Sequence, residues 1–137
     1  MDVNSHDPEV MLRILNDTRT IAVVGFSTHA YRAGYYVPAY LQQQGYEIIP
    51  INPNLDQALG KTAFANLEEI PGSVDLVLIF RRSEAVPPIV EQAIQIGAKA
   101  VWMQRGIVNE AAARQATQAG LDVVMDACMM VEHRHYC

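Results

Sequence analysis

The sequence predicts an α/β fold, a Rossmann-like doubly wound parallel sheet of five strands. Two expected strands, residues 20–25 and 74–80, are apolar throughout their central runs, residues 21–24 and 76–80, which is typical of strands whose two faces are both covered by helices. Segments with helical spacing lie between the strands, and such alternation predicts a parallel sheet with right-handed crossovers. With strands numbered along the chain, we expect the order 3-2-1-4-5. Ligands of such sheets bind outside the carboxyl ends of the strands, where the winding reverses, here between strands one and four.

The first half of the chain is expected to hold two helices and two strands. Apolar residues recur at helical spacing in residues 7–16, which predicts a short amphipathic helix at one edge of the sheet. The first strand follows at residues 20–25. The next helix begins only a few residues before Pro38, because proline disrupts a helix interior. The second strand, residues 47–51, ends at the strong turn signal of residues 52–54.

The second half continues the alternation after residues 55–71, where only a short helix at residues 67–70 is indicated. The expected elements are then a strand at residues 74–80, a helix whose first turn holds Pro87 and Pro88, a strand at residues 100–103, a helix capped by Asn109, and a strand at residues 121–125. Residues 126–137 have no clear period.

Size and composition fit a single domain over residues 1–137, with an N-terminal helix within residues 1–19 and a C-terminal tail at residues 126–137. The net charge of −5 argues against nucleic acid or an anionic membrane as a partner. No apolar run could span a bilayer, and the N-terminus lacks an apolar signal core. Cys128 and Cys137 have no CxxC spacing, so we expect no disulfide framework, no metal site and a reducing, cytoplasmic setting.

Residues 20–36 predict a phosphate site. A buried strand stops at Gly25, and a polar turn without Asp or Glu leads into a helix. Backbone N–H groups at a helix N-terminus have no intrahelical partner, and the helix dipole adds positive charge there. We expect this loop to hold the phosphates of a nucleotide-like ligand.

Half of the eight arginines follow strands at the same edge of the predicted sheet. These are Arg32, Arg81, Arg82 and Arg105. An arginine–phosphate pair is charge-assisted and can be bidentate, so an acidic protein with an arginine-lined rim is expected to bind a small polyanion. Taken singly, each arginine is equally consistent with an ordinary solvated charge.

The motifs of other nucleotide sites are incomplete. A dinucleotide fingerprint needs GxGxxG and an acidic residue at the end of the second strand, whereas this loop has only Gly25 and the strand ends at Ile51-Asn52. Gly60-Lys61-Thr62 is similar to the end of an ATP-binding P-loop, but no upstream glycine or strand precedes it. The incomplete dinucleotide and P-loop motifs argue against NAD and ATP as ligands.

Six motifs occur together in this chain: AVVGFS at residues 22–27, RxxY at 32–35, GYEIIPINPN at 45–54, IFRRSEAVP at 79–87, WMQRGIVNE at 102–110 and AGLDVVMDACMMVEH at 119–133. Together they resemble the small, single-domain coenzyme A-binding proteins, which are similar to the N-terminal domain of the succinyl-CoA synthetase alpha subunit. The resemblance covers residues 20–132 and implies a CoA-binding Rossmann-like fold.

The resemblance also implies which residues meet the ligand, and it implies no catalytic residue. The matching positions are Gly25, Ser27, Arg32 and Tyr35 in the pyrophosphate-side loop, Asn52, Pro53 and Asn54 in the second-strand turn, Phe80, Arg81 and Arg82 in the loop flanking the adenine and ribose phosphate, and Gln104 and Gly106 in the turn near the pantetheine arm. Two positions depart from the pattern. Gly34 stands where a serine is expected, which would remove one phosphate contact, and the unusual Pro38 would shift the helix start.

The expected function is non-catalytic binding of coenzyme A, free or acylated, because the synthetase needs a second domain and a partner subunit for its activity. Two alternatives stay open: a small NAD(P)-dependent oxidoreductase, and a protein-interaction or scaffold domain such as a homodimer. Cys128 is expected near the thiol end of the ligand. It could form a mixed disulfide with CoA or act as a nucleophile, but a free cysteine is more often an inert, buried hydrophobic residue.

Overall fold

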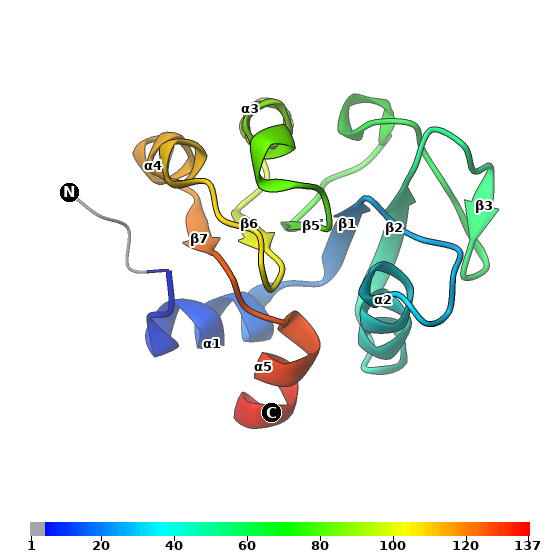
Figure 1. Ribbon diagram of the computed structural model, residues 1–137, viewed down its shortest axis with the longest axis horizontal. Coiled ribbons are helices and arrows are strands. Elements are labelled where there is room, and N and C mark those ends of the chain that lie inside the picture. The colour runs from blue at the N-terminus through cyan, green and yellow to red at the C-terminus, as the bar shows by residue number, and fades with distance from the viewer. Residues whose placement is uncertain (1–4) are drawn as a thin grey trace.

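The computed structural model describes residues 5–137, so the first four residues of the expected N-terminal segment lie outside it. A five-stranded parallel sheet forms its centre (Figure 1). The strands are β1 (Thr20–Val24), β2 (Glu47–Ile51), β5 (Leu76–Ile79), β6 (Ala100–Met103) and β7 (Asp122–Val124). Their order is β2-β1-β5-β6-β7, with every neighbouring pair parallel. The parallel, five-stranded α/β sheet is confirmed.

The predicted strand order 3-2-1-4-5 is wrong, because β5 pairs with β1 and not with β2. Counted over the five predicted strands, the observed order is 2-1-3-4-5. The outer side of β2 instead meets a single bridge at Phe64, whose N–H donates to the Pro50 carbonyl at 3.0 Å and whose carbonyl accepts from the Asn52 N–H at 2.9 Å. An element of one bridge leaves no alternating pattern in the sequence. The winding therefore reverses between β1 and β5, whereas the prediction placed the reversal between strands one and four, which are β1 and β6.

Helices cover both faces of the sheet. They are α1 (Pro8–Asp17), α2 (Ala33–Gln43), α3 (Val86–Gln95), α4 (Glu110–Gln118) and α5 (Met129–Tyr136). In Figure 1, α3 and α4 lie on one face, and α1, α2 and α5 lie on the other. Two 3-10 turns, η1 (Leu67–Glu69) and η2 (Ser83–Ala85), and a hairpin of β3 (Gln57–Ala58) and β4 (Lys61–Thr62) complete the described chain. None of the helices in residues 5–137 is long and apolar enough to cross a membrane.

Consecutive strand residues enter different hydrophobic cores. In β1, Ala22 and Val24 pack under α3 and α4, whereas Ile21 and Val23 pack against α1, α2 and α5. This alternation follows from the two-residue period of a strand, and it explains why residues 21–24 of β1 are all apolar. Trp102 of β6 is fully buried, and its Nε1–H donates to the Ala127 carbonyl at 2.9 Å. The sheet is thus fixed from both sides, and functional groups are left to the loops at its ends.

Charged groups at the amino ends of the strands are paired with one another. The Asp75 carboxylate accepts the backbone N–H groups of Arg19 at 3.0 Å and Thr20 at 3.1 Å, and it lies 3.5 Å from the Lys99 ammonium. Partial burial acts to raise the pKa of Asp75, but the two amide donors and the ammonium outweigh it, so the pKa lies below its usual value. These contacts join β1, β5 and β6 at this edge.

Candidate functional site

A cleft of about 590 Å³ opens at the carboxyl ends of β1, β2 and β5. It lies beside the point where the winding reverses, which is the place where open α/β sheets bind ligands. The predicted site residues that line it are Gly25, Ser27, Arg32, Asn52, Pro53, Asn54, Phe80 and Arg81. The structure therefore brings together residues from three separate loops, including the two arginines at positions 32 and 81.

Gly25 lets the β1 loop approach the end of β5 closely. Its φ is +87°, and a Cβ atom built on it would lie 2.8 Å from the Phe80 carbonyl oxygen and 3.1 Å from Cδ of Arg81. A side chain is therefore disfavoured both by backbone conformation and by space. This contact holds Arg81 beside the loop that carries Arg32.

The loop is tied to the first turn of α2 through Ser27. The Ser27 N–H donates to the Gly34 carbonyl at 3.1 Å, and the Ser27 hydroxyl accepts the His29 N–H at 3.1 Å. A helical carbonyl normally accepts the N–H four residues later, but Pro38 has no N–H to donate. The proline inside α2 therefore leaves the Gly34 carbonyl available to the loop.

Gly34 itself is buried, and it allows the helix to lie directly on the loop. A Cβ atom there would lie 3.0 Å from the Gly25 carbonyl oxygen and 3.4 Å from Cβ of Ser27. The serine expected at this position would crowd the turn. The helix begins at Ala33, which places Pro38 inside it, five residues after its start.

Asn52 shapes the second wall of the cleft. Its Nδ2–H donates to the Phe26 carbonyl at 2.9 Å, and its Oδ1 accepts the Asn54 N–H at 2.8 Å. Both ends of the side-chain amide are thus used within the protein. The end of β2 presents no carboxylate for a ribose diol, in agreement with the sequence argument against NAD.

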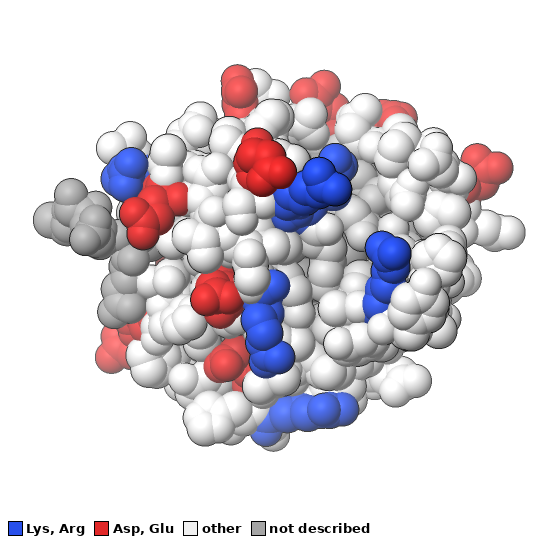
Figure 2. All heavy atoms as spheres, in the orientation of Figure 1, with Lys and Arg blue, Asp and Glu red and all other residues white. Residues whose placement is uncertain are grey.

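The cleft carries positive charge and free hydrogen-bond donors. Within residues 5–137 the backbone N–H groups of Phe26 and Thr28, which line the cleft, have no hydrogen-bond partner. Arg32, the N-cap of α2, and Arg81 take part in none of the ion pairs found in this part of the chain. Figure 2 shows basic side chains around a largely uncharged area at the middle and right of this face. Such an arrangement suits a phosphorylated anion.

The other predicted site residues lie outside the lining of this cleft. Tyr35 packs its ring 5.9 Å from that of Phe26, and Arg82 is exposed at the N-cap of η2. Gln104 is buried, and its Oε1 accepts the Met129 N–H at 3.3 Å, at the start of α5. Gly106 donates its N–H to Oδ1 of Asp126 at 2.7 Å. Gln104 and Gly106 thus help to shape the β6–α4 loop and its contact with α5.

Sequence reasoning missed Leu55 and Ala65, which also line the cleft. They belong to the segment between β2 and β5, where no helical or strand period could be found. A single bridge between Phe64 and Ile51 brings this segment to the sheet edge. In the sequence, the polar turn at residues 52–54 is the feature that indicates that the chain stays close to the cleft after β2.

Ionisable groups with shifted pKa values lie outside the cleft. Burial raises the pKa of Tyr46 to about 12, and its hydroxyl donates to the Leu15 carbonyl at 2.6 Å. Burial lowers the pKa of His133, which shares a 2.7 Å hydrogen bond with the Tyr40 hydroxyl. Cys128 is buried and lies at the N-cap of α5. The described residues contain no cluster of three His, Cys, Asp or Glu side chains that could hold a metal.

The fold and the cleft together define a class of protein, a Rossmann-like domain with a cation-lined cleft where the winding of the sheet reverses. The chain belongs to the CoA binding domain family, whose model matches residues 19–134. The resemblance that the six motifs indicated is thereby confirmed.

Relatives in sequence include both small and large proteins. The chain is 43% identical over 120 residues to the uncharacterized protein YneT of Bacillus subtilis (strain 168), covering 88% of this chain and 89% of that protein. It is 33% identical over 92 residues to the acetate–CoA ligase [ADP-forming] II subunit alpha of Pyrococcus furiosus, covering 66% of this chain. The chain spans only 20% of the length of that subunit.

Solved structures show the same fold. A hypothetical protein from Pyrococcus horikoshii OT3 has a TM-score of 0.92 at 34% identity, covering 99% of this chain and 96% of that one. The dinucleotide-forming acetyl-coenzyme A synthetase 1 of Ca. Korarchaeum cryptofilum has a TM-score of 0.70 at 24% identity, covering 80% of this chain and 26% of that one. The second likeness concerns the fold alone.

Proposed function

We propose that this protein binds coenzyme A or an acyl-CoA without transforming it. The observation that supports this most is that Arg32 and Arg81, from different loops and free of ion pairs within residues 5–137, line one cleft in a chain of the CoA binding domain family. The neighbouring N–H groups of Phe26 and Thr28 would donate to the diphosphate. Arg81, with Arg82 beside it, would meet the ribose phosphate.

The proposal of binding without catalysis rests on the chemistry of the cleft. The residues that line it include no Asp, Glu, Cys, Lys or Tyr, and they include one histidine, His29. The His29 side chain is exposed on the loop. Its ring lies 5.5 Å from that of Tyr31, and within residues 5–137 no hydrogen bond orients it, so it is a weak basis for acid–base or nucleophilic catalysis.

Isothermal titration with CoA tests the proposal. We expect saturable binding by the unchanged protein and weaker binding of dephospho-CoA, because Arg81 and Arg82 would lose a phosphate partner. Absence of both heat and thermal shift at millimolar CoA would overturn the proposal. Incubation with acetyl-CoA and a thiol reagent tests the non-catalytic part, since release of free thiol above the background rate would indicate an enzyme.

The same measurements separate the alternatives. A titration with NADH that saturated at micromolar concentration would favour an oxidoreductase, but the end of β2 has no acidic group for the ribose. A scaffold function would leave CoA without effect, and light scattering would then report whether the protein forms a dimer. Native mass spectrometry of the purified protein would reveal any ligand that it retains.

A further inference from the structure

Tyr31 is an exposed aromatic side chain at the rim of the phosphate cleft. It is 74% exposed, the largest value among the exposed large hydrophobic side chains of residues 5–137. His29 and Arg32, which stand on either side of it in the chain, both line the cleft. The phenol ring therefore stands in water in the free protein, directly beside the place where the phosphates of the ligand are proposed to bind.

The ring of Tyr31 forms a cluster with these two cleft residues. Its centroid lies 5.5 Å from that of the His29 ring, with an angle of 39° between the planes, and 6.0 Å from Cζ of Arg32. A guanidinium at about this distance from an aromatic ring is attracted to it. These contacts hold Tyr31 against groups that line the cleft, and its high exposure shows that most of the ring surface is still uncovered.

The backbone that carries this cluster is fixed before any ligand binds. The Arg32 N–H donates to the His29 carbonyl at 3.0 Å, which closes a turn around Tyr31. The Ser27 hydroxyl accepts the His29 N–H, and the Arg32 carbonyl accepts the Tyr35 N–H at 2.9 Å where α2 begins. Since the turn is already ordered, a ligand that contacts the ring loses little binding free energy to the ordering of the loop.

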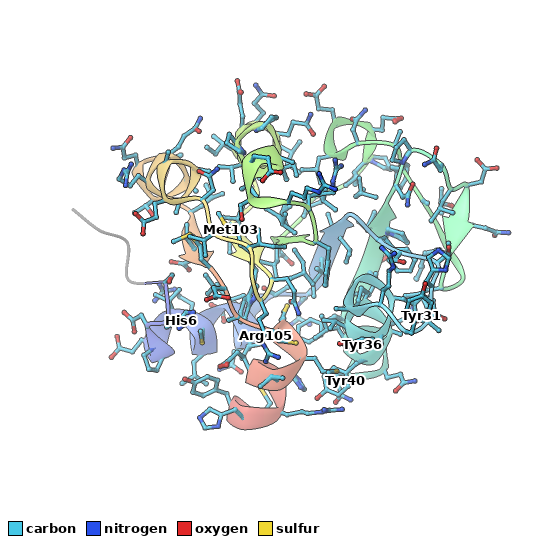
Figure 3. All side chains as sticks on the ribbon, in the orientation of Figure 1. His6, Tyr31, Tyr36, Tyr40, Met103 and Arg105 are labelled. Carbon is cyan, nitrogen blue, oxygen red and sulfur yellow. The ribbon has the colours of Figure 1, made fainter. Side chains whose placement is uncertain are left out.

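The cleft also has an apolar part at the β2 side. Pro53, Leu55 and Ala65 line it where the chain leaves β2 and returns to the sheet edge. Figure 3 shows Tyr31 at the side of α2 that is nearer to β3, the strand that begins two residues after Leu55, whereas Tyr36 lies toward α5. The aromatic cluster and these apolar residues thus lie at the same end of the cleft. A flat, largely apolar group suits such surroundings better than a phosphate does.

Coenzyme A has one flat aromatic group, the adenine ring, which is joined to the diphosphate through a ribose. The Thr28 N–H, a proposed donor to that diphosphate, lies three residues before Tyr31 in the same loop. Aromatic side chains stack on bases because every base presents a π face. We infer that Tyr31, supported by His29 and Arg32, stacks on the adenine ring of the bound coenzyme and thereby positions its nucleotide end.

This inference rests on the proposed function, and affinity measurements on variants of Tyr31 test it. Calorimetry with CoA should show about three- to tenfold weaker binding by Tyr31→Ala, which corresponds to the loss of one aromatic pair. Tyr31→Phe keeps the ring and should stay within about twofold of the unchanged protein. Tyr36→Ala is the matched control, because Tyr36 is also exposed and lies on the first turn of α2 but does not line the cleft. It should bind CoA normally.

An NMR measurement separates stacking from a purely structural effect of Tyr31. An aromatic ring moves the resonances of protons that lie over its face upfield, so the H2 and H8 protons of adenine should shift upfield on binding to the unchanged protein. The shift should be retained with Tyr31→Phe and reduced with Tyr31→Ala. Weaker binding by Tyr31→Ala with an unreduced shift would mean that Tyr31 only supports the loop, and it would overturn the inference.

The calorimetric results also tell this inference apart from the proposed function. If CoA binds equally well to the unchanged protein and to Tyr31→Ala, the stacking inference fails and the proposed function stands. If CoA binds to neither, the proposed function fails and the stacking inference fails with it. Equal weakening by Tyr31→Ala and Tyr36→Ala would assign the effect to the surface of α2 in general and would also overturn the inference.

Discussion

Charged side chains are paired with one another at the amino edge of the sheet, whereas the arginines of the cleft at the carboxyl edge have no ion-pair partner within residues 5–137. At the amino edge, Asp75 is paired with Lys99 and accepts two backbone N–H groups, and Arg13 holds Asp122 through two hydrogen bonds of 2.7 and 2.9 Å. At the carboxyl edge, Arg32 and Arg81 share a cleft and have no acidic partner within residues 5–137. Charges at the first edge hold strands and helices together. Those at the second remain available to a ligand, so mutations at the two edges should separate stability from binding.

Gly25→Ala should have the largest effect, because it should reduce both the stability of the protein and its binding of CoA. The new Cβ would meet the Phe80 carbonyl oxygen at 2.8 Å, and the backbone would keep a positive φ. We expect a loss of about 2–4 kcal/mol in the free energy of unfolding, measured with urea, and loss of CoA binding.

Gly45→Ala is the control for backbone strain alone. Gly45 has a φ of +104°, but nothing lies within 4 Å of a Cβ built on it. The free energy of unfolding of this variant should fall by only about 1 kcal/mol, and the variant should bind CoA normally. Equal stability of the two variants would show that the contact between the β1 loop and β5 is loose.

Arg32→Ala and Arg81→Ala should change binding without changing stability. Neither side chain has an ion-pair partner to lose within the described chain, so the free energy of unfolding should move by less than about 0.5 kcal/mol. Each should weaken CoA binding at least about tenfold, since each removes a charge-assisted contact. Calorimetry measures the affinity. A large loss of stability with normal affinity would remove the distinction between the two edges.

Asp75→Asn should show the reverse pattern. The carboxylate accepts hydrogen bonds from two backbone N–H groups and pairs with Lys99. Its neutral replacement should therefore lower the free energy of unfolding by about 1–2 kcal/mol and leave the affinity for CoA unchanged. The pKa of Asp75 is lowered in the folded protein. Its contribution is therefore complete above the usual carboxyl pKa and is lost as the pH falls through the lowered value. Urea titrations at acidic and neutral pH should show the variant and the parent protein converging in acid.

Arg13→Ala should have the smallest effect. The side-chain hydrogen bond to Asp122 raises the pKa of Arg13, but the pair is exposed to solvent and is screened by salt. We expect a small loss of thermal stability in dilute buffer that disappears in concentrated salt. A loss that persists in salt would mean that α1 is held at this edge by packing of the arginine stem.

The sequence predicted the regular elements better than their arrangement. β2 and β6 have the predicted bounds, and their apolar patterns reflect burial between helices. The strand order could not be predicted, because the element beside β2 is reduced to the bridge at Phe64 and leaves no period to detect. Helix α5 was missed for a related reason: only Met129 of its residues is buried, so its apolar face is too short to show a helical repeat.

The residues of the cleft were predicted mostly from motifs. Positions on loops that follow strands, such as Arg32 and Arg81, could be placed at one edge because parallel strands end on the same side. Leu55 and Ala65 were not found, because their position depends on how an irregular segment returns to the edge of the sheet. Pro38 was recognised as unusual, but its effect on the Gly34 carbonyl requires the three-dimensional path of the loop.

Pro38 also has a consequence for engineering. Replacing an interior proline is an ordinary way to strengthen a helix, and Pro38→Ala would restore the hydrogen bond from residue 38 to the Gly34 carbonyl. That carbonyl already accepts the Ser27 N–H, so the repaired helix would compete with the loop for one acceptor. A more heat-resistant variant obtained in this way would carry a less well-ordered ligand loop, which makes position 38 a point where thermostability and recognition are in conflict.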